Sequence, residues 1–163
     1  MRNQTLQEGV VELGTIEREI FVEASPQVVF DVVSSPEHLR QWWPDDAGFD
    51  PVPGSDGEIV FGDRNAGGTV VAFTVVDVRP PRSFAFRWTH RAGEVAAEGN
   101  SLLVTFDLTP SGAGTLLRMT ETGFREMGWA AAVLEQQYAE HGTGWDFYLP
   151  RLAAYAAGLE VRR

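Results

Sequence analysis

Residues 83–122 read SFAFRWTHRAGEVAAEGNSLLVTFDLTPSGAGTLLRMTET, and this stretch decides the fold because apolar and polar side chains alternate in three successive runs. The runs cover Ser83–Arg91, Asn100–Leu108 and Thr115–Thr122, and a period of two is typical of strands with one buried face. Gly99-Asn100 and residues 110–114, PSGAG, supply turn signals between them. Such connections favour antiparallel hairpins, so the centre of the chain predicts an antiparallel sheet.

The same alternation upstream extends this sheet to six strands. Two more strands are predicted at Glu58–Gly62 and Gly68–Val78, and the first strand covers Ile16–Glu23. Residues 65–68 and 79–81 supply the glycines and prolines of the intervening turns.

Two helix-start signals separate the first strand from the others. Ser25-Pro26 and Ser35-Pro36 each place a hydroxyl and a proline where a helix begins. They predict two short helices, ending near Val33 and at Trp42-Trp43. Pro, Gly, Asp and Ser dominate Pro44–Gly57, which predicts a long surface loop.

The C-terminal part of the chain has the period of a helix, first over Trp129–Tyr138 and then beyond Thr143. Thr143 and Asp146 form an aspartate version of a capping box, which predicts that the long helix begins here. Pro150 lies too deep for a first-turn proline and predicts a kink near Asp146. The apolar stripe of this helix is Trp145, Tyr148, Leu149, Leu152, Ala156 and Leu159.

The order of elements predicts an α+β domain in which a curved six-stranded antiparallel sheet packs its concave face on the C-terminal helix. The sheet needs this helix because its strands cannot bury an apolar face unaided. We expect one domain over residues 15–163, preceded by an N-terminal tail or strand extension over residues 1–14.

Composition excludes several classes of partner. The net charge is −10 and the 13 basic residues, all arginine, are scattered, which disfavours nucleic acid and anionic membrane surfaces. Apolar runs are too short for membrane insertion, and the N-terminus lacks the apolar region of a secretory signal, so we expect a cytoplasmic protein. Without cysteine, and with histidines outside metal-ligand spacing, neither a metal nor a cofactor is expected.

Five sequence blocks follow one another in an order and spacing shared with a known family. They lie within Val22–Phe30, Ser35–Trp43, Arg79–Trp88, Gly114–Phe124 and Gly144–Leu152. Together, over about residues 15–158, they resemble the helix-grip domains of the START-like (SRPBCC) superfamily, and within it the activator of Hsp90 ATPase homologue 1-like family. The resemblance implies a helix-grip fold with a hydrophobic cavity between sheet and helix. It does not fix function, since members resemble lipid carriers, polyketide cyclases and co-chaperone domains.

The cavity predicts the candidate site. His90 and Glu121 are the polar ends of two otherwise apolar strand rows, and both would look into the cavity if the rows face inward. A histidine beside a carboxylate in an apolar cleft is a candidate general base, whereas a location at strand ends would leave both groups solvated. The aromatic residues would line the cavity or form the core. The predicted ligand-binding residues are Trp42, Trp43, Phe61, Phe73, Phe86, Trp88, His90, Val104, Phe106, Leu117, Met119, Glu121, Trp145, Tyr148, Leu149 and Leu152.

Three functions follow as hypotheses. The first is a module that binds a small, largely apolar molecule without chemistry, because the lining is apolar with few polar points. The second is a cyclase- or hydratase-like enzyme with His90 and Glu121 as acid/base groups. The third is an interaction domain similar to the Hsp90 co-chaperones. Eukaryotic activators carry a further N-terminal domain that engages the chaperone, and this chain has no comparable length before its first strand, so chaperone binding is not the expected role. An exposed edge strand would allow a homodimer.

Overall fold

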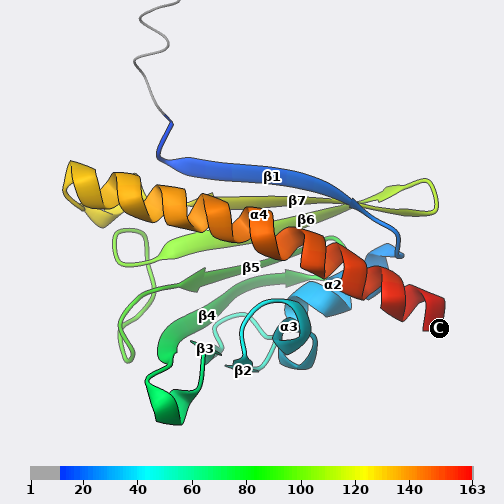
Figure 1. The fold of residues 1–163 in the computed structure, drawn as a ribbon, viewed down its shortest axis with the longest axis horizontal. Helices are drawn as coiled ribbons and strands as arrows, with labels where there is room; N and C mark the ends of the chain where they lie inside the picture. The colour runs from blue at the N-terminus through cyan, green and yellow to red at the C-terminus, as the bar shows by residue number, and fades with distance from the viewer. Residues whose placement is uncertain (1–11, 163) are drawn as a thin grey trace, which may run out of the picture.

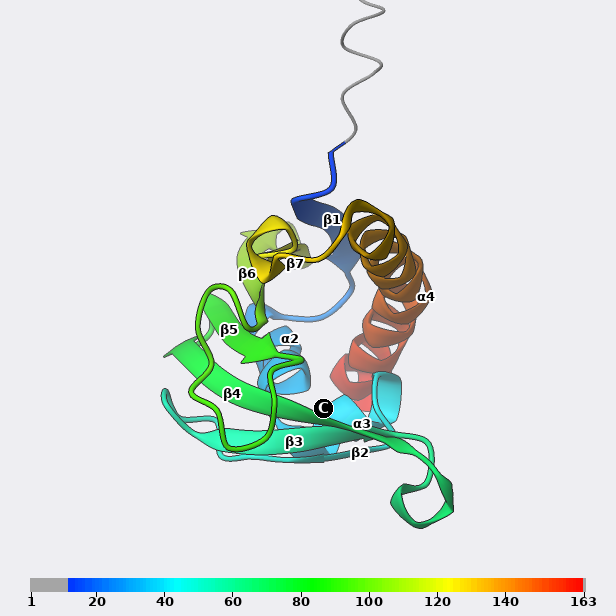
Figure 2. The ribbon, with the colours of Figure 1, turned by 90° about the vertical axis from the view of Figure 1, so that its left-hand side faces the viewer.

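A curved antiparallel sheet wraps around one long helix, as Figures 1 and 2 show. The computed structural model describes residues 12–162, so most of the predicted N-terminal tail lies outside the described residues. In chain order, the strands and α-helices are β1 (Thr15–Val22), α2 (Pro26–Ser34), α3 (Pro36–Trp42), β2 (Asp46–Gly48), β3 (Asp56–Phe61), β4 (Thr69–Arg79), β5 (Ser83–Trp88), β6 (Leu102–Ser111), β7 (Gly114–Thr122) and α4 (Ala131–Arg162). The α+β helix-grip prediction is confirmed.

The strand order is β1-β7-β6-β5-β4-β3-β2, with every neighbouring pair antiparallel. Successive hairpins build the sheet from β2 to β7, while β1 joins its far edge beside β7 because α2 and α3 carry the chain across. The prediction of six strands is wrong by one, since the described residues form seven. The additional strand β2 pairs over three residues with β3 inside the segment predicted as a loop, and it is too short to show an alternating pattern.

The two short helices begin where the sequence predicts. The hydroxyl of Ser25 accepts a hydrogen bond from the backbone N–H of Val28 at 3.3 Å, and Pro26 occupies the first turn of α2. The indole N–H of Trp42, at the end of α3, donates to the carbonyl of Val32 at 3.0 Å. This bond ties α3 to α2 within the core.

The predicted start of the C-terminal helix at Thr143 is wrong, because α4 is one continuous helix of 32 residues that begins at Ala131. Contacts with β1 hold its first half: the hydroxyl of Tyr138 donates to the carbonyl of Thr15 at 2.7 Å, and Arg18 bonds Asp146 at 2.6 Å. Such packing overrides a local capping signal. Pro150 lies inside the helix without ending it, and the kink stays a prediction.

The concave face of the sheet and one face of α4 form the core. In β5, β6 and β7 the inward rows predicted from the alternation are buried, and four members of the predicted α4 stripe are buried against them. The buried residues of these rows and of the stripe are Phe84, Phe86, Trp88, Leu102, Val104, Phe106, Leu108, Leu117, Met119, Trp145, Leu149, Leu152 and Ala156.

Within the described chain, no helix has the length and apolar character needed to span a bilayer.

Candidate functional site

A fully buried carboxylate lies between the sheet and α4. Glu121 is on the inward face of β7, has no exposed surface, and pairs in register with Ile16 of β1 and Val104 of β6. Its Oε2 accepts the indole N–H of Trp88 at 2.7 Å, and its Oε1 accepts that of Trp145 at 2.8 Å. Two locations were open for Glu121 from the sequence, inward or solvated at a strand end, and the structure shows the inward one.

A histidine that the sequence interpretation set aside completes this arrangement. The Nδ1 of His141 lies 3.0 Å from Oε1 and 3.1 Å from Oε2 of Glu121. His141 and Trp145 are four residues apart on α4, so both project from one face of the helix toward the carboxylate. Burying a carboxylate is costly unless its oxygens are hydrogen-bonded, and here two indole N–H groups and the Nδ1 of His141 surround it.

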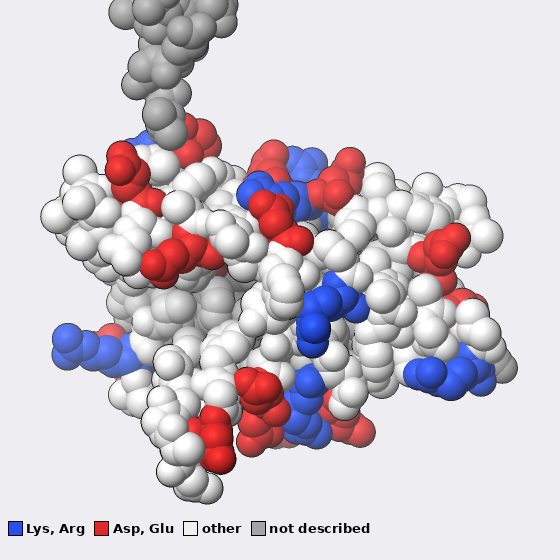
Figure 3. Space-filling model, in the orientation of Figure 1, with Lys and Arg blue, Asp and Glu red and all other residues white. Residues whose placement is uncertain are grey.

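An aromatic pocket opens next to this cluster. It has a volume of about 210 Å³, and a recess is visible beneath the N-terminal half of α4 in Figure 3. The Trp43 ring contacts three other lining rings, with centroid distances of 5.0 Å to Trp88, 5.2 Å to Trp145 and 6.0 Å to Phe61. We call this hollow the aromatic pocket. Its lining consists of Trp43, Phe61, Trp88, Glu140, His141, Gly144, Trp145 and Tyr148.

His141 connects the aromatic pocket to the buried Glu121. Its side chain is 14% exposed, and its ring lies 5.3 Å from that of Trp88 and 5.4 Å from that of Phe124. Within the described part of the chain, Nδ1 takes part in hydrogen bonds and Nε2 in none. One nitrogen is therefore fixed by Glu121 while the other is available to a ligand.

His90 lies elsewhere, on the other face of the sheet. Thr89 has φ of 72°, a left-handed conformation that ends β5 and breaks the alternation on which the prediction rested. The Nε2 of His90 instead lies 3.1 Å from the hydroxyl of Thr74, which donates to Asp56 at 2.7 Å. The structure thus does not bring His90 and Glu121 together.

The His90 ring is buried, with Asp56, Glu94 and Arg87 as the nearest charged influences. The residue is 7% exposed, its Nδ1 has no hydrogen bond, and burial lowers its pKa below the ordinary histidine value. It borders a hollow of about 670 Å³ beneath the segment 90–96. Apart from Thr74, no hydrogen-bond partner among the described residues reaches the ring, and the lining of this hollow is charged at Asp56, Glu58, Arg91 and Glu94, unlike the aromatic pocket.

The other predicted ligand-binding residues divide between pocket and core. Trp43, Phe61, Trp88, Trp145 and Tyr148 line the aromatic pocket. The rest fill the space between sheet and helices with their own side chains; Phe73 and Phe86, for example, stack with centroids 4.3 Å apart. The core members are Trp42, Phe73, Phe86, Val104, Phe106, Leu117, Met119, Leu149 and Leu152.

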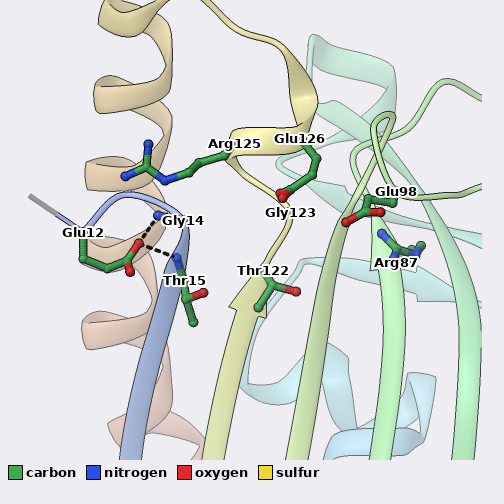
Figure 4. Close-up of a pocket in the computed structure, with 9 residues that line it drawn as sticks. All are labelled: Glu12, Gly14, Thr15, Arg87, Glu98, Thr122, Gly123, Arg125 and Glu126. Atoms are coloured by element: carbon green, nitrogen blue, oxygen red, sulfur yellow. Dashed lines mark hydrogen bonds between the residues drawn. The ribbon is translucent and has the colours of Figure 1, made fainter.

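A third hollow, near the start of β1, is polar (Figure 4). It measures about 300 Å³ and combines the acidic Glu12, Glu98 and Glu126 with the basic Arg87 and Arg125. The carboxylate of Glu12 accepts the backbone N–H groups of the first residues of the strand region, as the dashed lines in Figure 4 show. Charges of both signs and no aromatic wall make it a poor site for an apolar ligand.

Charged groups elsewhere form neither a metal site nor a basic surface on the visible face. Among residues 12–162, no group of three His, Asp or Glu side chains is placed to hold a metal ion. Acidic and basic side chains are interspersed over the face drawn in Figure 3, without a basic cluster.

Comparison with known proteins identifies relatives over nearly the whole domain. The family model for "Activator of Hsp90 ATPase homolog 1-like protein" matches residues 23–157. No curated protein matches the chain.

Solved structures share the fold at low sequence identity. Protein MLL2253 from Mesorhizobium loti is 23% identical, with a TM-score of 0.69, over 86% of this chain and 95% of that one. The Aha1 dimer from Colwellia psychrerythraea is 21% identical, with a TM-score of 0.64, over 85% and 92%. CalU16 from Micromonospora echinospora is 19% identical, with a TM-score of 0.62, over 91% and 79%. At these identities the likeness establishes the fold alone, so the homodimer stays a prediction.

Proposed function

The chain belongs to the activator of Hsp90 ATPase homologue 1-like family, and we propose that it binds a small, largely apolar, planar molecule in the aromatic pocket. The observation that carries the proposal is the wall of five aromatic side chains beside a buried, hydrogen-bonded Glu121. Apolar lining with a few well-placed polar groups is the usual character of small-molecule sites.

The pocket volume limits the size of the ligand. Pockets for drug-sized molecules measure about 300–1,000 Å³, and an apolar cavity of about 150 Å³ is enough to hold benzene. At about 210 Å³, the aromatic pocket suits a single ring with small substituents. Aromatic walls favour such a ring through stacked or edge-to-face contacts.

Gly144 offers a direct test, because a side chain there would occupy the pocket. A Cβ built at Gly144 meets no atom within 4 Å, so Gly144→Leu extends into open pocket space without a clash at its first atom. Gly158 is the matched control on the same helix: it lies outside the pocket, and its Cβ would be 3.9 Å from the nearest atom.

The experiment titrates single-ring aromatic compounds into the wild type, Gly144→Leu and Gly158→Leu, with ligand-observed NMR and tryptophan fluorescence as readouts. We expect binding to the wild type and the control and its loss in Gly144→Leu. Unchanged binding in Gly144→Leu would show that the aromatic pocket is not the site. Native mass spectrometry of freshly purified protein identifies any small molecule that copurifies.

The contact between Glu121 and His141 favours a second candidate function, acid/base catalysis. A histidine oriented by a buried carboxylate can accept a proton from a bound substrate at its free Nε2. This candidate replaces His90 of the sequence hypothesis by His141. Its test is exchange of carbon-bound ligand protons for deuterium in D₂O. We expect the wild type to accelerate the exchange and His141→Gln to lose this acceleration while it still binds the ligand. If the wild type does not accelerate the exchange, catalysis is contradicted and only the binding function remains.

A further inference from the structure

The bonding of Glu121 determines which nitrogen of His141 carries a proton. Indole N–H groups only donate, so each oxygen of Glu121 acts as the acceptor of one such hydrogen bond. With both of its oxygens already accepting, Glu121 leaves the donor role to the Nδ1 of His141, 3.0 Å from Oε1, so Nδ1 carries the proton. In a neutral imidazole, Nε2 is then a hydrogen-bond acceptor.

This acceptor belongs to a side chain of the pocket wall and is open to a partner. His141 lines the pocket, and Nε2 has no hydrogen-bond partner among the described residues. Buried side-chain atoms without a partner, in the described part of the chain, are only Oγ1 of Thr89 and Nδ1 of His90. The Nε2 of His141 is therefore reached by solvent or ligand.

The charges around the pocket oppose anionic ligands. Glu140 stands at its wall, Glu121 lies behind it, and none of the described residues lining it is arginine. A carboxylate or phenolate would meet acceptors and negative charge, whereas a neutral ring with a donor group would find acceptors, Nε2 of His141 among them, and aromatic walls.

We infer that the aromatic pocket selects neutral single-ring aromatic molecules bearing an O–H or N–H donor, which hydrogen-bond to Nε2 of His141; this rests on the proposed function of the pocket. Phenols and N–H heterocycles belong to this ligand class. His141 is then the residue that determines specificity, and the tryptophans supply ring contacts that do not depend on the donor group.

Phenol and anisole test the inference because they share a ring and differ in the donor. Phenol is neutral at pH 7.5, since its hydroxyl ionises near pH 10. The dissociation constants of both are measured by NMR titration for the wild type, His141→Phe and the control His38→Phe, whose histidine bonds Tyr155 outside the pocket. Comparing ratios cancels the different hydration of the two probes.

We expect His141→Phe to lower the preference for phenol over anisole by roughly three- to tenfold, the effect of one hydrogen bond, while His38→Phe leaves it unchanged. An equal ratio in the wild type and His141→Phe overturns the inference but leaves the pocket as a binding site. If neither probe binds, the proposed function fails as well.

A second measurement does not depend on the folding of a variant. Long-range ¹H–¹⁵N spectra of the wild-type imidazole rings distinguish protonated from unprotonated nitrogens. We expect an unprotonated Nε2 on His141 whose resonance shifts with phenol and not with anisole. A proton on Nε2 in the free protein at pH 7.5 overturns the inference.

Discussion

Trp145→Phe tests whether Glu121 is held as a buried charge. The substitution removes the indole N–H that reaches Oε1 at 2.8 Å. Trp42→Phe is the matched change: it removes a similar indole from an equally buried site, but that N–H donates to the neutral carbonyl of Val32 at 3.0 Å. The loss of ring volume is common to both, so the pair isolates the acceptor.

The expected difference follows from the strength of the two hydrogen bonds. A hydrogen bond to a charged group contributes about 1.5–3 kcal/mol, and one between neutral groups about 0.5–1.5 kcal/mol. Trp145→Phe should therefore lower the free energy of unfolding by about 1 kcal/mol more than Trp42→Phe. Urea unfolding followed by far-UV circular dichroism measures both without relying on tryptophan emission. An equal or smaller cost for Trp145→Phe would refute an ionised Glu121 in this site.

Three further predictions concern stability. Gly144→Ala should raise the free energy of unfolding by about 0.5–1 kcal/mol in thermal or urea unfolding, because alanine is the better helix former and its Cβ meets open space. Gly142→Ala should raise it less, since the new Cβ would lie 3.3 Å from Nη2 of Arg18. Arg18→Met breaks the ion pair with Asp146, in which the Arg18 side chain is 36% exposed and that of Asp146 is 61% exposed. The free energy of unfolding should therefore fall by less than about 1 kcal/mol, and the difference from the wild type should shrink in high salt. Burial lowers the pKa of His90, so near and below about pH 6.5 the unfolded state binds more protons than the folded state, and the free energy of unfolding falls as the pH drops. Between pH 7.5 and 5.5, the urea midpoint of His90→Gln should therefore fall less than that of the wild type.

The sequence predicts the sheet well because a period of two registers directly which side chains face inward. The inward rows of β5 and β7, including Glu121, follow from alternation alone. Alternation no longer predicts the facing of side chains where the backbone leaves regular strand geometry. The positive φ of Thr89 turns His90 to the outer face, and no pattern of residue types in the sequence indicates that conformation.

The partner of Glu121 was missed for a related reason. His141 precedes the capping signal at Thr143, so an interpretation that begins the helix at that signal leaves the histidine outside it. The contact with Glu121 joins residues 20 positions apart. It depends on how α4 packs on the sheet, and this tertiary arrangement cannot be read from a local sequence pattern. The spacing of His141 and Trp145 on a continuous helix was the available signal.

Two glycines of α4 connect its packing to the pocket. Each lowers helix propensity by about 1 kcal/mol relative to alanine, so packing must compensate for their presence. Gly142 is buried, and its missing side chain lets the helix lie close to Arg18 of β1. Gly144 leaves open space beside Trp145, where a larger residue would complete the core. The pocket therefore exists where the helix carries no side chain, and the aromatic residues that fill the rest of the interior form its rigid walls. Filling that space should cost binding and not stability, which is the separation that Gly144→Leu and Gly144→Ala measure together.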